Sequence, residues 1–242
     1  MLSVDLAVDP DWDLTHPPTA QMMQETAEEG LIDGNLGGPP CSTVSRARFN
    51  TRAKGPRPLR TRGEYVWGLP NLRPFEQARV VEANTLFVNA VSYFEAVSLQ
   101  DGVHLLEHPV DPGEHPYPSF FDTDLLKGME SRTGARRITF DQCCYGQKAC
   151  KRTTLSSTVD GLVELVCTCP GVSDTHTGTA LLRAGTSGGS SSPRPWSVTR
   201  LSFVVHSRSA SSQPLLACFE KALGQEVLSG RAGGDQGLRL TR

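Results

Sequence analysis

The chain of 242 residues has room for one full domain and a shorter appendage, but not for two large cores. Its formal net charge of -2 excludes a general electrostatic attraction to nucleic acid, so binding of that kind must come from a local basic patch. No run approaches the roughly 20 apolar residues that a membrane-spanning helix needs, and the acidic start is unlike a secretion signal. Seven cysteines, odd in number and unevenly spaced, argue against a disulfide scaffold. We therefore expect a reducing compartment, with thiols that are free, catalytic or metal-bound.

Strand-like and helix-like patterns alternate along the first two thirds of the chain. In chain order we predict a strand end (2–8), a helix (19–30), a strand (31–36), a long helix (75–97), a strand (103–106), a short helix (123–130) and two strands (137–140 and 162–166). Such alternation favours a largely parallel sheet covered by helices, with ligands at the carboxyl ends of the strands. Cys41 and Glu107 both fall at such ends.

Two further segments differ in composition from this pattern. Residues 45–63 hold seven Lys or Arg, several Pro and Gly, and no acidic residue. This composition predicts an exposed basic loop. Beyond residue 178 the chain becomes rich in Ser and Gly, with one amphipathic stretch over 215–228. We therefore predict a folded domain over 1–178 and a low-complexity, partly disordered tail over 179–242.

The segment GGPPCSTVSRAR is the most informative in the chain, because it places a thiol behind two rigid prolines and ahead of the cationic loop. It resembles the Pro-Pro-Cys motif of the DNA cytosine-5 methyltransferases. The resemblance implies that Cys41 is a nucleophile that attacks carbon 6 of a flipped-out cytosine and activates carbon 5 toward the methyl group of S-adenosylmethionine. The alternative is a cysteine that merely fills a tight turn.

Two later segments follow in the order that this family has. LLEHP is similar to its Glu-Asn-Val or Glu-Asn-Pro motif, with His108 in place of the asparagine, and implies that Glu107 is the acid partner of the attack. FDQCCYGQKACKRTTL resembles a strand motif that holds the target base and a phosphate, in the form found in phage and mobile elements, and implies roles for Tyr145, Lys151 and Thr153. The alternatives are a solvated strand-end carboxylate and an exposed basic hairpin.

Upstream, VDLAVDPDWDL is similar to the cofactor segment of the same family. The resemblance implies that Asp5 bonds the ribose hydroxyls of S-adenosylmethionine, that Asp13 and Leu14 contact its adenine, and that Pro39 also lines the cofactor. The chain has no Phe-x-Gly-x-Gly turn, so we expect it to lack the first cofactor-binding strand, as in an incomplete fragment.

The resemblance as a whole implies an α/β, Rossmann-like methyltransferase sheet with helices on both faces. It implies double-stranded DNA as partner, with a nuclear or otherwise DNA-associated location, and neither a membrane nor a protein partner is evident. The basic loop and the later motif are expected to contact DNA. The expected contacts are Ser45, Arg46, Arg48, Arg52, Lys54, Arg57, Arg60, Arg62, Tyr145, Lys151 and Thr153.

Other readings stay open. Cys167, Cys169 and His176 hint at a metal site, but their spacing completes no zinc motif. The cysteines at 143, 144 and 150 could add ligands, though strand packing accounts for them more simply. We therefore predict no metal. The chain could instead be an inactive, mobile-element-derived remnant that binds DNA non-specifically through its basic loop. A thiol-dependent or metal-dependent hydrolase around Cys41 ranks last, because no histidine is well placed for it.

Overall fold

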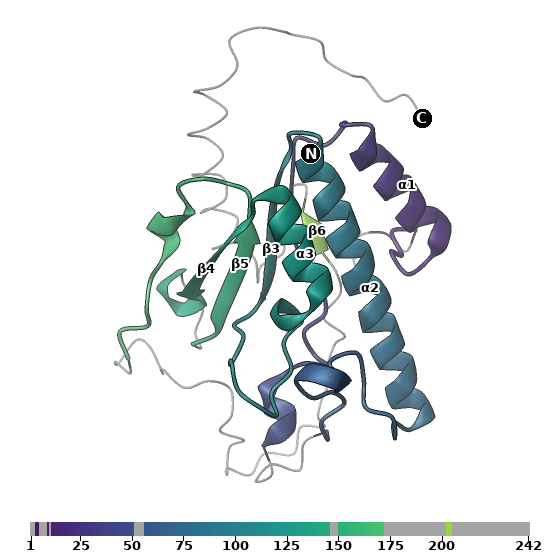
Figure 1. Cartoon of the computed structure of the whole chain (residues 1–242), viewed down its shortest axis with the longest axis vertical. Coiled ribbons are helices and arrows are strands. Elements are labelled where there is room, and N and C mark those ends of the chain that lie inside the picture. Colours follow the sequence, from purple (N-terminus) through teal and green to yellow (C-terminus); the bar gives the residue numbers. More distant parts are fainter. Residues whose placement is uncertain are drawn as a thin grey trace, which may run out of the picture.

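The computed structural model describes residues 3–4, 9, 11–50, 56–145, 150–171 and 202–204, the first and last of these as backbone strands (Figure 1). The α-helices are α1 (Pro17–Glu28), α2 (Pro74–Leu99) and α3 (Asp124–Thr133). The strands are β1 (Ser3–Val4), β2 (Gly34–Gly38), β3 (Val103–Pro109), β4 (Arg136–Asp141), β5 (Arg152–Ser157) and β6 (Ser202–Val204). Short 3-10 helices are η1 (Arg46–Phe49), η2 (Gly63–Tyr65), η3 (Phe120–Asp122), η4 (Gln142–Tyr145) and η5 (Leu162–Leu165).

The strands form one mixed sheet in the order β1-β6-β2-β3-β5-β4. Its four longer strands are β2, β3, β5 and β4, of which β2 and β3 are parallel neighbours. Strand β5 lies antiparallel between β3 and β4, and the short strands β6 and β1 also pair antiparallel. The predicted α/β class is thus confirmed and is compatible with a Rossmann-like sheet. The expectation of a largely parallel sheet is wrong, because β4 and β5 form a hairpin in which β5 lies between β3 and β4 and runs antiparallel to both.

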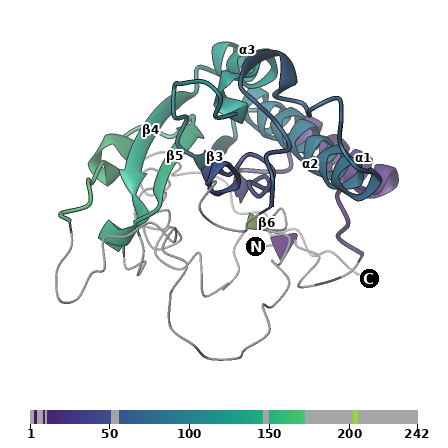
Figure 2. The same cartoon turned by 90° about the horizontal axis from the view of Figure 1, so that it is seen from below.

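The α-helices cover one face of the sheet. Figure 2 shows α1, α2 and α3 together on the same side of β3, β4 and β5. Their buried side chains form one core with Leu106 of β3, with Phe87 and Phe94 of α2 fully buried at its centre. Phe120 of η3 stacks on Phe87 with 4.0 Å between ring centroids. In the described part of the chain, the expectation of α-helices on both faces is therefore wrong.

A smaller apolar cluster covers the opposite face. Leu105, Phe140 and Leu155 point away from the helices and pack against Val159 and Leu162. Adjacent residues Leu105 and Leu106 thus lie in different cores, as the alternation of a strand requires. The face that lacks α-helices is closed by the segment around η5.

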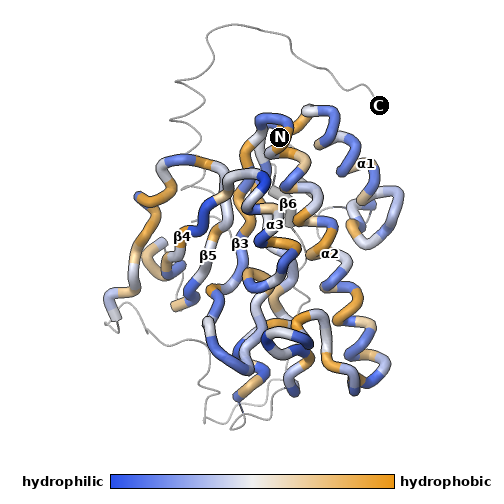
Figure 3. Tube along the Cα trace, in the orientation of Figure 1, coloured by the Kyte–Doolittle hydropathy of each residue, from blue (hydrophilic) through white to orange (hydrophobic). Residues whose placement is uncertain are grey.

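Helix α2 confirms the predicted long helix. It begins at Pro74, a favoured first position, and the Glu76 carboxylate accepts a 2.9 Å bond from the Arg73 backbone N–H. Hydrophobic residues recur along α2 among hydrophilic ones (Figure 3). After it, Gly102 lets the chain pass so close to Ile32 that a Cβ would lie 2.6 Å from the Ile32 carbonyl oxygen. No helix in the described ranges is both long and apolar enough to cross a bilayer.

One predicted strand is wrong. Residues 162–166 begin with the 3-10 helix η5, because Gly161 adopts a left-handed conformation (φ 77°) that ends the extended chain. The predicted strands do not include β6, which lies within the segment expected to be a tail, or β5, whose side chains are mostly polar and mostly buried. Its hydroxyls satisfy one another and the backbone, as in the 2.8 Å contact of Thr154 with Thr139 and the 2.5 Å bond from Ser157 to the His104 carbonyl. The boundary at residue 178 and the amphipathic stretch over 215–228 lie outside the described residues.

Candidate active site

Cys41 lies in a turn just beyond the end of β2. The strand closes with Gly38, and two buried prolines lead to the cysteine, whose carbonyl accepts a 3.1 Å bond from Val44 N–H. The thiol is half-buried and packs against the helix-covered core. Burial raises the pKa of Cys41, the charge of Lys151 lowers it, and the charge of Glu107 raises it. The three groups are therefore close enough to interact electrostatically although they come from distant parts of the sequence.

Glu107 lies near the end of β3, beside Gly38 of the parallel neighbour. A Cβ at position 38 would lie 2.8 Å from Glu107 Oε2, so the absence of a side chain there makes room for the carboxylate. Glu107 Oε1 accepts a 3.1 Å bond from Lys151 Nζ and a longer one, at 3.4 Å, from Gln142 Nε2. No described residue donates a hydrogen bond to Oε2, which leaves this oxygen available to a ligand.

Lys151 reaches Glu107 from the chain entering β5. Burial by itself would lower the pKa of Lys151, but Glu107 and Cys41 together hold it above its ordinary value. Gln142, which sequence reasoning did not single out, completes the group by donating to Glu107 and, at 3.0 Å, to Thr153 Oγ1. A carboxylate and an ammonium group thus meet beside the end of β2, and the turn that carries Cys41 follows that end.

His108 takes no part in this group, although it follows Glu107 directly. Alternation along β3 turns its ring to the helix-covered face, where it packs against Phe120 at 5.3 Å and Phe121 at 6.0 Å between ring centroids. Burial lowers the pKa of His108 to about 3, so the ring is neutral at physiological pH. It is a core residue, at the position where the motif that LLEHP resembles has an asparagine.

The described part of the expected cofactor segment serves the local fold. Asp13 Oδ1 accepts bonds from the Thr15 hydroxyl at 2.7 Å and from its N–H at 2.9 Å, and the hydroxyl bond lowers the pKa of Asp13. Leu14 is buried in the core, and Pro39 is also buried. Asp5 lies outside the described residues. Asp13 and Leu14 thus serve the local fold, and a role for them in binding S-adenosylmethionine stays a prediction.

The expectation that the basic loop is uniformly exposed is wrong. Arg60 is fully buried, and its guanidinium donates to four neutral acceptors: Thr43 Oγ1, Val66 O, Asn84 Oδ1 and Val80 O. Arg48 is buried too, and donates to the Ser42 and Arg57 carbonyls. The sequence gives no charge signal for this burial, because no acidic partner is involved in these bonds.

The other expected DNA contacts of this loop have intramolecular partners. Arg57 pairs with Glu76 at 2.6 Å, and Arg62 pairs with Asp111 at 2.5 Å. Arg46 is exposed, lies over the ring of Tyr117 and approaches Glu114 at 3.7 Å. Ser45 caps η1 by accepting a bond from Ala47 N–H. Arg52 and Lys54 lie outside the described residues, so a role for them in binding DNA stays a prediction.

Two residues of the later motif point into the protein. The Tyr145 hydroxyl donates to the Leu165 carbonyl at 2.6 Å, and its ring packs edge-on against Phe140. Thr153 is fully buried. For Thr153 and Arg60 a direct DNA contact would require the surrounding chain to open, whereas Lys151 is partly exposed and accessible.

The pairing and the positions of the cysteines differ from expectation. Cys144 and Cys167 form a disulfide, which corrects the prediction that the thiols are unlinked. The thiols of Cys143, Cys150 and Cys169 lie within 4.8 Å of one another, a cluster that packing in a strand does not explain. The sequence signal for it is the clustering of five cysteines within residues 143–169.

Comparison with known proteins does not identify a family. No family model matches the chain, and no curated protein or solved structure is significantly similar to it. The functional conclusion therefore depends on the geometry of the site and on the resemblance of the motifs, and the observation on which it rests is the contact of Lys151 with Glu107 beside the end of the strand that leads to Cys41.

Proposed function

We propose that the chain activates cytosine in DNA for methylation at carbon 5, with Cys41 as nucleophile and Glu107 as its acid partner. The observation that carries the proposal is the 3.1 Å contact of Lys151 with Glu107 beside Gly38, the residue that ends the strand leading to Cys41. The three residues were assigned from separate motifs, up to 110 residues apart, on strands that are neighbours in the sheet.

The arrangement suits addition of a thiol to a pyrimidine ring. The Cys41 thiol gives its proton to the Glu107 carboxylate and its sulfur forms a bond to carbon 6. The electrons of the 5,6 double bond move to carbon 5 and through carbon 4 toward nitrogen 3, which takes the proton from Glu107. Lys151 holds Oε1, so Oε2 beside Gly38 is the oxygen left for a base. Once a donor had methylated carbon 5, loss of the carbon 5 proton to water and release of the sulfur from carbon 6 would restore the double bond.

The methyl donor follows from the resemblance alone. S-adenosylmethionine would supply an electrophilic methyl group. The bonds of Asp13 within its own turn and the burial of Leu14 favour a second candidate, an inactive remnant that binds DNA non-specifically. That candidate predicts DNA binding that weakens with salt and is unaffected by S-adenosylmethionine or by Cys41→Ser.

The test uses the full chain and a Cys41→Ser control with two duplexes. The first carries 5-fluorocytosine, which traps the protein covalently only after methyl transfer, and is incubated with and without S-adenosylmethionine. The second carries 2-pyrimidinone in place of cytosine, whose more electrophilic ring reports thiol addition alone. Adducts that survive denaturation are counted by gel shift.

The proposal expects a 5-fluorocytosine adduct that requires both Cys41 and S-adenosylmethionine. An adduct with 2-pyrimidinone only would retain Cys41 as nucleophile and remove methyl transfer. No adduct with either duplex, while DNA binding persists in wild type and Cys41→Ser alike, would overturn the proposal in favour of the remnant.

A further inference from the structure

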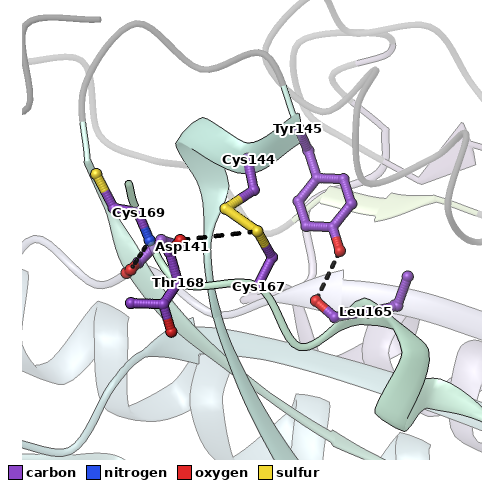
Figure 4. Close-up of a disulfide and its surroundings, with 7 residues drawn as sticks. All are labelled: Asp141, Cys144, Tyr145, Leu165, Cys167, Thr168 and Cys169. Carbon is purple, nitrogen blue, oxygen red and sulfur yellow. Dashed lines mark hydrogen bonds between the residues drawn. A yellow bond between two sulfur atoms is a disulfide. The ribbon is translucent and has the colours of Figure 1, made fainter. Parts of the chain in front are cut away.

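Three cysteine thiols converge on the side of the hairpin that carries Lys151. Cys143 lies in η4, Cys150 precedes β5, and Cys169 follows η5, and their sulfur atoms all lie within 4.8 Å of one another. The three segments are also held by contacts that do not involve these sulfurs. Asp141 N–H donates to the Cys167 carbonyl at 2.9 Å, and Asp141 Oδ2 accepts a 2.7 Å bond from Cys169 N–H (Figure 4).

The cluster is too close-packed for three thiolates in the absence of a cation, since its three sulfur atoms all lie within 4.8 Å of one another. Three thiolates at this separation would repel one another, whereas a divalent cation among them would reverse that balance and displace their protons.

Asp141 supplies a second, independent observation. The residue is only 3% exposed, and its Oδ1 has no hydrogen-bond partner among the described residues. A buried carboxylate oxygen without a donor is unfavourable unless positive charge or a bound water lies nearby. Its other oxygen, Oδ2, accepts the Cys169 N–H at 2.7 Å, which places the carboxylate beside the thiol cluster.

We propose that Cys143, Cys150 and Cys169 bind one zinc ion as thiolates. Zinc is the divalent ion that intracellular proteins most readily hold with several cysteines, at about 2.3 Å from each sulfur. Sulfur atoms 4.8 Å apart or less close around such an ion with small side-chain adjustments. Three thiols lose three protons in the process, and Asp141 orients Cys169 through its backbone N–H.

The ion would fix both ends of the loop that completes the candidate active site. Cys150 immediately precedes Lys151, whose Nζ lies 3.1 Å from Glu107. Cys143 immediately follows Gln142, which donates to the same carboxylate oxygen. Zinc would therefore position Lys151 and Gln142 on Glu107. The metal proposal itself does not depend on methyl transfer, since metal binding is measured without substrate.

The experiment measures metal bound to the full chain purified under reducing conditions. Excess zinc or cobalt(II) is added, free metal is removed, and bound metal is counted by atomic absorption. Wild type and Cys41→Ser, a cysteine outside the cluster, should each retain close to one ion. The cobalt form should show intense thiolate-to-metal absorption in the near ultraviolet. Cys143→Ser, Cys150→Ser and Cys169→Ser should each weaken binding, and the triple variant should bind none.

A second measurement needs no variant. Calorimetric titration of wild type with zinc in two buffers of different ionisation enthalpy gives the number of protons released, which should approach three. Release near zero, or absence of bound metal in wild type, would overturn the proposal. Equal metal content in wild type and the folded triple variant would overturn it as well. The double variant Cys144→Ser/Cys167→Ser should keep the ion. If this variant loses the ion while the triple variant retains it, the ligands are Cys144 and Cys167 and the proposal is overturned.

Discussion

Two cations lie close to the turn that carries Cys41, and their surroundings differ. Arg60 is fully buried beneath the helix-covered face, where it donates to Thr43, two residues beyond Cys41, and lies 5.1 Å from the ring of Phe120. Lys151 lies at the sheet edge, with about half its side chain exposed and its ammonium group on Glu107. The sequence suggests a DNA contact for both, yet one region uses its cation to hold the fold and the other presents it beside a thiol and a carboxylate. Burial and the type of partner, more than charge, separate a structural role from a chemical one.

Replacing Arg60 should have the largest effect. Arg60→Met removes all four donated bonds and leaves Thr43, Asn84 and two backbone carbonyls unsatisfied. We expect a loss of about 3 kcal/mol or more in the free energy of unfolding, measured by urea denaturation. The exposed Arg46→Met serves as matched control, with an expected change within about 0.5 kcal/mol. Equal effects of the two variants would contradict the contrast between the interior and the surface.

The second largest effect should be a loss of stability on acidification, caused by the two buried histidines of β3. Burial lowers the pKa of His104 to about 4 and that of His108 to about 3, from an ordinary value of 6.5. Below pH 6.5 the unfolded chain binds protons that the folded chain does not, so stability falls as the pH drops toward 4. The slope should approach about 1.4 kcal/mol per pH unit for each histidine. Urea denaturation at several pH values should give a shallower slope for His108→Phe, and an unchanged slope would show that His108 is accessible to protons in the folded protein.

The smallest effects should appear at the sheet edge, as opposite shifts in the reactivity of Cys41. Lys151→Gln removes the charge that lowers the Cys41 pKa, and Glu107→Gln removes one that raises it. Alkylation of Cys41 by iodoacetamide, followed by mass spectrometry of its peptide, should therefore shift to higher pH in the first variant and to lower pH in the second. Arg152→Gln, an exposed neighbour in β5, should leave the profile unchanged. Shifts in the same direction for the two variants would contradict the electrostatic coupling.

The helices and the ends of β2 and β3 could be predicted because local signals there agree with the fold. Gly30, a residue type typical of helix ends, adopts φ 71° just after α1, and the apolar stripe of α2 lies on the core. The strand β5 could not be predicted in this way. Its hydroxyl-rich sequence reads as a polar hairpin, and the bonds from Thr154 and Ser157 that make its burial possible connect it to residues far away in the sequence.

The three main residues of the candidate site could be predicted from the sequence, but the residues that hold them in place could not. Cys41, Glu107 and Lys151 were assigned from short motifs, whereas Gln142 enters only because the β4–β5 hairpin folds over Glu107. Arg60 was misassigned because a guanidinium buried on neutral carbonyls has no counter-charge that a sequence pattern could reveal. The histidine after Glu107 was taken for a variant of the motif, yet the period of β3 turns it into the core.

The reversed direction of β5 also affects how such a site can change over evolutionary time. In a wholly parallel sheet, each residue at this edge would belong to a different crossover, and altering the site would mean adjusting several connections at once. Here the turn from β4 to β5 returns to the same edge, so one stretch, residues 142–151, contributes Gln142, Cys143, Cys150 and Lys151. The described ends of this stretch thus reach the site from one piece of chain, and a change there would leave the pairing of β2 with β3 untouched.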